Sequence, residues 1–260
     1  MRKSKILIAA ALTLFTTCRV SAQTDLDDLI NKFSSSDWKV VKAAKTDLEN
    51  LEEQAIDELI SLLDKDVFVK LTNSGTLIYP GAEKIYGHGQ IIDYSIDNLS
   101  IRSGWLLEEI TFNNFGFSGI HLPDENLIPF IKITFPDYYN NATNRKKLET
   151  SSGPELSRLI HKLSVKAAKD WWADEKDDWT RIEGLQDALK SFDEKRQVKA
   201  LFYIRNGTTK CTNLTKEFYY NNISKEIVRL SGSETLRVAE HARWILFDSK
   251  LTWLDNKGAD

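Results

Sequence analysis

Apolar side chains recur at helical spacing over most of this chain, and this periodicity restricts the fold more than any other feature. The first stripe follows the i, i+3, i+4, i+7 spacing that marks one face of a helix. It consists of Leu26, Leu29, Ile30 and Phe33. Two more stripes run from Trp38 to Leu51 and from Ile56 to Leu63, separated by short turns. Such short connections require neighbouring helices to pack on each other, so the sequence predicts a mainly α-helical fold.

Two segments resemble HEAT-type (armadillo-type) helical repeats. Residues 25–66 contain a leucine-rich helix, a Ser/Asp turn and a helix with the pattern V-V-x-A-A. Residues 222–248 contain Ile227, Val228 and Leu230 before a turn, and the sequence Leu-Arg-Val-Ala after it. The resemblance implies an α-α superhelical stack that presents a concave or grooved surface to another protein.

The stretch from Leu77 to Phe117 interrupts the helical pattern. Its first half is rich in glycine and tyrosine, which predicts an irregular insertion in which a short strand pair is an alternative to a plain loop. Its second half predicts a helix from about Asn98 to Phe112, closed by Gly116. Because apolar residues occupy two opposite sides of this helix, we expect it to be covered on both sides and to lie at the centre of the molecule.

The remainder of the chain is less uniform. Residues 120–140 fit either a kinked helix or an edge strand, and we favour the helix; the polar residues 140–153 suggest a linker or a mobile loop. Pro154 then begins a helix whose apolar face includes Leu163, Ala167 and Trp171. We expect residues 23–260 to form a single helical-repeat domain, with a subdivision into 23–140 and 154–260 as the alternative.

The N-terminus has the pattern of a secretory signal peptide. Basic residues precede an apolar run from Ile6 to Phe15, and Val-Ser-Ala stands before Gln23, which predicts cleavage after Ala22. The alternative is a lipoprotein anchored at Cys18, but the residues before Cys18 are bulkier than such a site requires. Removing residues 1–22 takes away four cationic side chains, which moves the formal net charge from −3 to −7.

Charge and cysteine content limit the compartment and the partners. An acidic mature chain argues against nucleic acid and anionic lipid as partners. Only Cys211 remains after cleavage, so no intramolecular disulfide can form, and this favours a bacterial periplasmic or secreted protein. After residue 22 we find no run of the roughly 20 apolar residues that a membrane span requires.

Motifs for catalysis or cofactor binding are absent from the sequence. There is no H-E-x-x-H or C-x-x-C pattern for a metal, no G-x-S-x-G for a nucleophilic serine and no phosphate-binding G-x-x-x-x-G-K-[ST]. We therefore expect neither a metal nor a cofactor. Sugar stacking is a minor alternative for the aromatics around an acidic turn, although interhelical packing explains them as well. These aromatics are Trp171, Trp172 and Trp179.

Glu108 is the strongest candidate for a chemically active group. It shares a helix ridge with Ile101 and Trp105, so a buried ridge would bury the carboxylate, which must then find a partner or rise in pKa. One interpretation is a structural carboxylate bonded to backbone N–H groups, to Arg102 or to Lys84. The other is a general acid or base of an envelope hydrolase, assisted by His88.

The glycine- and tyrosine-rich segment is the candidate for binding. His88 stands between Gly87 and Gly89, where the backbone is free enough to present an imidazole at a loop tip. Three tyrosines surround it in sequence and complete a predicted recognition surface, namely Tyr79, Tyr86 and Tyr94. The alternative is a loop folded over the helical core, with the tyrosine rings buried.

These observations favour a binding protein over an enzyme. We expect an exported scaffold of HEAT-like type, without catalysis, that recognises a protein partner in the cell envelope. An immunity or inhibitor protein that blocks a toxin or envelope enzyme would be a narrower version of this role. An envelope hydrolase using Glu108 is the alternative, and a structural spacer is a third.

Overall fold

The computed structural model describes residues 25–79 and 90–247, and these residues are mainly helical. The predicted all-α class is therefore confirmed, while HEAT-like superhelical stacking stays a prediction. The predicted signal peptide with Cys18, and the loop residues Tyr86 and His88, lie outside the described residues. In chain order the helical elements are residues 25–33, α2 (Trp38–Asn50), η1 (Glu52–Ala55), α3 (Ile56–Leu62), α4 (Leu99–Thr111), η2 (Phe117–Gly119), α5 (Asp124–Thr134), α6 (Pro136–Asn140), α7 (Ala142–Thr150), α8 (Gly153–Glu175), α9 (Arg181–Lys190), α10 (Glu194–Asn206), α11 (Lys216–Phe218), the π-helical turn η3 (Tyr219–Ile223), α12 (Ser224–Leu230) and α13 (Leu236–Phe247).

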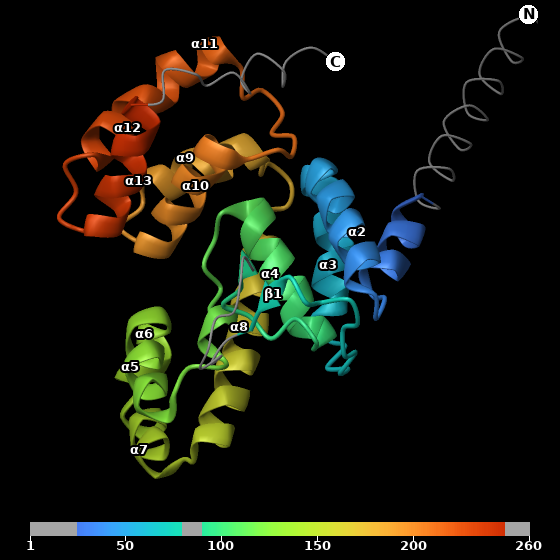
Figure 1. Ribbon diagram of the computed structural model, residues 1–260. Helices are drawn as coiled ribbons and strands as arrows, with labels where there is room; N and C mark the ends of the chain where they lie inside the picture. Colours follow the sequence, from blue (N-terminus) through green and yellow to red (C-terminus); the bar gives the residue numbers. More distant parts are fainter. Residues whose placement is uncertain (1–24, 80–89, 248–260) are drawn as a thin grey trace, which may run out of the picture.

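Helix α4 is the centre of the molecule (Figure 1). Every residue of α4 except Glu109 is buried, which agrees with the prediction that this helix is covered on both sides. Helices α2 and α3 pack against it, and α8 and α9 also contact it. Close packing extends to Gly104, where an added Cβ would lie 2.5 Å from the ring of Phe117. Any side chain at this position would displace the loop that follows α4.

The ends of α4 differ in part from the prediction. Asn98 caps the start, because its side chain accepts the N–H of Ile101 at 3.1 Å. The helix ends at Thr111, where Phe112 adopts a left-handed conformation with φ 55°. Gly116, also left-handed with φ 99°, is the residue that precedes η2, so the expectation that Gly116 closes α4 was wrong. A non-glycine residue ends the helix because the Phe112 ring is buried in the neighbouring core.

Arg102 ties the segments around the N-terminal half of α4. Its side chain is 0% exposed and donates from Nε to the carbonyl of Ile96 at 2.7 Å. Nη1 donates to Phe33 and Ser35 at 2.8 and 2.9 Å, and Nη2 donates to Val69 at 3.2 Å. Burial lowers the pKa of Arg102 to about 10. One side chain therefore satisfies backbone carbonyls from three separate stretches of chain.

The only strands in the described part of the chain form one short parallel pair. Strand β1 (Leu77–Ile78) lies beside β2 (Gln90–Ile91), with Leu77 opposite Gln90. This pair corresponds to the strand alternative considered for the glycine- and tyrosine-rich insertion.

Helices α5, α6 and α7 form a limb that leaves the central helix beside α8 (Figure 1). The preference for helix in residues 120–140 is confirmed by α5 and α6, and Pro129 lies inside α5. Residues 140–153, expected to be a linker or mobile loop, instead contain α7. Only Leu148 of α7 is buried, and this single anchor explains why the segment has no apolar stripe.

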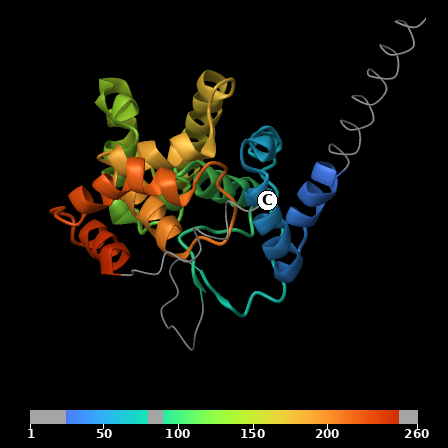
Figure 2. The same cartoon turned by 90° about the horizontal axis from the view of Figure 1, so that it is seen from above.

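The buried apolar residues fall into two clusters. The first core runs from Ile30 to Trp179 and includes α8, and the second runs from Ile182 to Ile245 and takes Phe112 from the end of α4. Apart from Phe112, the first core ends at Trp179 in the sequence and the second begins at Ile182. Seen from above, the elements of the second core lie on the opposite side of the molecule from α2 (Figure 2). No helix of residues 25–79 and 90–247 has the length and apolarity to cross a membrane.

Candidate functional site

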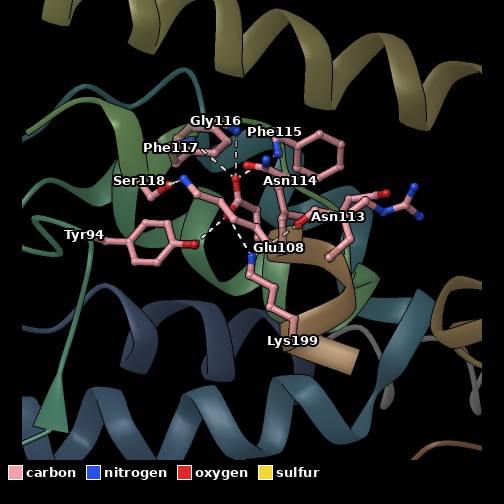
Figure 3. Close-up of polar contacts among 12 residues, drawn as sticks. Tyr94, Glu108, Asn113, Asn114, Phe115, Gly116, Phe117, Ser118 and Lys199 are labelled. Carbon is pink, nitrogen blue, oxygen red and sulfur yellow. Dashed lines mark hydrogen bonds and ion pairs between the residues drawn. The ribbon is translucent and has the colours of Figure 1, made fainter. Parts of the chain in front are cut away.

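Glu108 occupies the middle of a buried polar network (Figure 3). Its side chain is 1% exposed. Oε1 accepts the backbone N–H groups of Phe115, Gly116 and Phe117 at 2.8, 3.0 and 3.3 Å. Oε2 accepts the hydroxyl of Tyr94 at 2.5 Å and Nζ of Lys199 at 2.8 Å. The carboxylate thus joins α4 to the loop that follows it and to α10.

This arrangement occupies the acceptor positions of Glu108. An ionised carboxylate offers about four lone-pair positions, and five donors already point at them. A general base needs a free lone pair within reach of the substrate proton. The arrangement corresponds to the structural interpretation of Glu108. Its charged partner is Lys199 of α10, whereas Arg102 donates to backbone carbonyls.

Two of the tyrosines predicted to form a recognition surface, Tyr79 and Tyr94, bond to different carboxylates inside the fold. Tyr94 is 6% exposed, and burial together with the Glu108 carboxylate raises the pKa of its hydroxyl well above the usual value. The Tyr79 hydroxyl donates instead to Asp97 at 3.1 Å. Burial and Asp97 raise the pKa of Tyr79 to about 12. Both hydroxyls are therefore protonated donors within the fold, and Tyr86 and His88 lie outside the described residues.

A cleft of about 520 Å³ opens above this network. It is bordered by α2, residues 92–94, α4, α10, residues 206–209 and α13. Tyr94, Phe112 and Lys199 line it, so it lies where the two hydrophobic cores meet. Clefts of this size between packed units are the usual position of ligand sites, and we call this one the central cleft.

Arg181 is the most unusual residue in the wall of the central cleft. It is 1% exposed, and its guanidinium lies 4.8 Å from the centre of the Tyr203 ring and 5.5 Å from that of Phe112. Nη1 donates to the carbonyls of Glu49 (2.9 Å) and Lys210. Nη2 donates to the Thr209 hydroxyl at 3.3 Å, but Nε has no partner. Within residues 25–79 and 90–247, no carboxylate forms an ion pair with Arg181.

His241 of α13 also lines the cleft and adjoins an exposed surface. Its Nδ1 is buried without a partner, and burial and the positive charges of Arg237 and Arg205 lower its pKa. The His241 ring contacts Phe202 at 6.3 Å between centroids, and Arg205 lies 4.9 Å from the Trp244 ring centre. We call this continuous surface the α10–α13 ridge. It comprises Phe202, Arg205, Arg237, His241 and Trp244.

In a serine–histidine pair elsewhere in the molecule, the hydrogen bond runs in the wrong direction for nucleophilic catalysis. Ser100 Oγ lies 2.8 Å from Nε2 of His161, but the hydroxyl donates to the Leu63 carbonyl at 2.6 Å. His161 must therefore donate to the serine oxygen, whereas a catalytic serine donates to its base. Ser100 is also 0% exposed. The pair joins α4 to α8.

The tryptophans considered for sugar stacking pack against one another. Trp171 lies 5.6 Å from both Trp172 and Trp179 between ring centres. Trp172 donates its indole N–H to Asp57 at 2.6 Å, and both Trp172 and Trp179 are buried. This cluster has the geometry of interhelical packing. In the part of the chain that the structure describes, no three His, Cys, Asp or Glu side chains converge as metal ligands would.

Sequence reasoning did not find Arg181, Lys199 or His241. Arg181 follows Thr180, which forms a capping box with Glu183, so its position in the sequence is that of an exposed first-turn residue. No protein-family model, no curated protein and no solved structure matches this chain. The central cleft and the α10–α13 ridge are the two features of the described residues that have the character of binding surfaces.

Proposed function

We propose that this protein is an exported, non-enzymatic scaffold that binds a protein partner of the cell envelope through the α10–α13 ridge. The observation that carries the proposal is the exposure of two large aromatic side chains between arginines. Phe202 is 55% exposed and Trp244 is 57% exposed. Exposed aromatics that adjoin a cleft are typical of interaction sites.

The charges of the ridge favour an acidic partner surface. Arg205 and Arg237 form no ion pair within residues 25–79 and 90–247, and Arg205 stacks on Trp244. Arginine and tryptophan are the residues most enriched at the energetic centres of protein interfaces. An acidic segment of the partner would pair with the arginines while its apolar side chains cover Trp244 and Phe202.

Two features of the buried polar groups support a role without catalysis. Glu108 is surrounded by donors, and the Ser100 hydroxyl donates away from His161. Export rests on the signal-peptide pattern of residues 1–22. A partner that this protein inhibits, such as a toxin or an envelope enzyme, would be the narrower case, because inhibition requires only export, stability and a complementary surface.

A photocrosslinking experiment tests the proposal. A photoreactive phenylalanine analogue is placed at position 202 of the full chain in intact cells, and at position 133 as the matched control. Ile133 is 80% exposed but lies on α5, away from the ridge. We expect a crosslink to a different protein from position 202 only, and its loss when Arg205→Glu reverses the local charge.

Three outcomes would contradict the proposal. The first is the absence of any crosslink from position 202, and the second is an equal crosslink from position 133. The third is a crosslink to a second copy of this chain, which sedimentation of the purified protein would confirm as self-association. If the crosslink survives Arg205→Glu, the protein partner is supported, but the proposal that its contact surface is acidic is wrong.

A further inference from the structure

The geometry of the central cleft points to a binding site for a carboxylate attached to an aromatic or aliphatic group. The site is formed by Arg181, Arg237 and His241, with Phe202 and Tyr203 beside them. This inference does not rest on the protein-partner proposal, because a free organic acid would be bound by the same groups.

Arg181 supplies an unused donor in the wall of the cleft. Its Nη atoms are occupied by two carbonyls and a hydroxyl, while Nε is unpaired. Arg181, Tyr203 and Phe112 all line the central cleft, so this buried guanidinium lies beside the space that a ligand would enter. A buried donor without an acceptor is destabilising, because it has lost its hydrogen bonds to water. A carboxylate oxygen at Nε would remove this cost and neutralise the buried charge.

His241 supplies a second unused polar atom. Its Nδ1 is buried without a partner on the same cleft, and Arg237 lies close enough to lower the pKa of the imidazole. Glu240 acts in the opposite direction but more weakly than Arg237 and Arg205. An anion placed between Arg237 and His241 would accept hydrogen bonds from both and would reverse the effect of the arginines on the imidazole.

The balance of charge favours a single negative charge over a polyanion. Two lysines of the cleft are already paired with carboxylates, Lys45 with Glu49 and Lys199 with Glu108. The remaining formal charges in the lining are those of Arg181, Arg237, Asp93 and Glu109. Because these four cancel, an anion here is held by direct hydrogen bonds from the arginines rather than by a net positive field. A dianion would lose more hydration than a carboxylate for the same contacts, so the carboxylate is favoured.

Aromatic side chains would hold the uncharged part of the ligand. Tyr203 is 8% exposed at the cleft wall, and Phe202 is 55% exposed at its border. Ring-to-ring contact of this kind stabilises a complex beyond the burial of apolar area. The cleft volume of about 520 Å³ accommodates a ligand of one or two rings.

Titration of the full chain with benzoate tests the site, with the imidazole of His241 followed by NMR. We expect saturable shifts and a rise in the pKa of His241 on binding. Benzyl alcohol, which has the same ring but no charge, should leave that pKa unchanged. In Arg237→Gln benzoate should bind about tenfold more weakly, as expected for the loss of one charge-assisted hydrogen bond.

The matched control is Arg243→Gln. Arg243 is an exposed arginine of the same helix, but its Nε donates to the Ser231 carbonyl at 2.9 Å and it does not line the cleft. Benzoate should bind Arg243→Gln and the parent chain equally. Because Arg237 is exposed, its replacement should leave the fold intact, which thermal unfolding verifies.

A second probe identifies the source of the carboxylate. N-acetyl-Glu-Phe-amide carries its only carboxylate on a side chain, as a partner protein would. Tighter binding of this dipeptide than of benzoate would indicate a protein side chain, and the reverse order would indicate a free organic acid. The inference is overturned if neither probe raises the pKa of His241, or if Arg237→Gln binds both as well as the parent chain. A failed crosslink from the ridge would not affect this result.

Discussion

Arg102 and Arg181 are both almost completely buried, and the structure gives them different surroundings. All three nitrogens of Arg102 donate to backbone carbonyls inside the first core. Arg181 lies where the two cores meet, with aromatic rings against its plane and with Nε unpaired. In Arg102 every nitrogen of the guanidinium group donates a hydrogen bond within the fold, whereas Arg181 keeps one nitrogen that could donate to a further acceptor.

This difference separates a structural site from a candidate binding site. Neither arginine has an ion-pair partner within the described residues, so a buried positive charge alone does not indicate a ligand. What distinguishes Arg181 is an unpaired donor in the wall of a cleft. Substitutions at both arginines and at the groups around them test this distinction.

Replacing Arg102 should have the largest effect on stability. Arg102→Met would leave the carbonyls of Phe33, Ser35, Val69 and Ile96 without their donor, and we expect the free energy of unfolding to fall by about 3–5 kcal/mol. Urea unfolding of the purified chain measures this. A loss below about 1 kcal/mol would show that Arg102 does not hold these segments.

Glu108 connects the surroundings of the two arginines, because it joins α4 to α10. Glu108→Gln keeps an acceptor for the backbone N–H groups but leaves Lys199, which is 17% exposed, without a counter-charge. We expect a loss of about 2–3 kcal/mol. A double-mutant cycle with Lys199→Met, measured by urea unfolding, should give a coupling of at least about 1 kcal/mol. If the effects of the two substitutions on the free energy of unfolding were additive, Glu108 and Lys199 would not be coupled.

Replacing Arg181 should cost less than replacing Arg102. Arg181→Met removes donors from the Glu49 and Lys210 carbonyls, but it also removes a donor that has no partner. We expect the free energy of unfolding to fall by about 1–2 kcal/mol. The same denaturation experiment measures it. If Arg181→Met and Arg102→Met lowered the free energy of unfolding equally, the unpaired Nε would not distinguish a binding site from a structural one.

Acidification should weaken both regions through their histidines. Burial lowers the pKa of His161 and of His241 below the ordinary value of 6.5, so the unfolded chain binds more protons than the folded chain below that pH. Stability should fall as the pH falls through 6.5 and level off below the folded-state pKa. Thermal unfolding from pH 8 to 5 would show a smaller decline in His161→Gln, and a decline unchanged by that substitution would exclude His161 as a cause.

Substitutions on the α10–α13 ridge should hardly change the free energy of unfolding. Trp244→Ala and Phe202→Ser alter side chains that are already more than half exposed, so each should change the free energy of unfolding by no more than about 0.5 kcal/mol. Trp244→Ala should nevertheless abolish the crosslink expected from position 202, and Phe202→Ser should weaken capture of the same partner by the purified protein. A large loss of stability would mean that the two aromatics belong to the core rather than to a binding surface.

Much of the arrangement around α4 could be predicted from the sequence. Apolar residues on opposite sides of the helix indicated burial on both sides, and the position of Glu108 beside Trp105 indicated a buried carboxylate. Its partner could not be predicted, because Lys199 is 91 positions away along the chain and on a helix with several other lysines and arginines. The pairing depends on how α10 packs against α4.

The errors have equally local causes. For α8 the sequence indicated a face from Leu156 and Ile160 to Leu163, Ala167 and Trp171. Leu156 and Ile160 are buried as expected, but farther along the helix the buried residues are Ser164, Ala168 and Trp172. Small residues allow close approach of α4 and η2, so proximity rather than hydrophobicity selects this face. The central cleft was missed for a related reason. Arg181 lies in a first helical turn, and it is buried because segments distant in the sequence pack against it, namely Glu49, Phe112, Tyr203 and residues 209–210.

The packing of Gly104 against Phe117 has a consequence for recognising relatives of this protein. Gly104 admits the Phe117 ring, Gly116 supplies the positive φ before it, and Glu108 holds the N–H groups of both residues. Substituting any one of these residues would therefore disturb the contacts of the others. The four residues lie within one short stretch of sequence, so the pattern Gly-x(3)-Glu-x(7)-Gly-Phe should serve as a diagnostic signature in chains whose overall similarity has otherwise been lost.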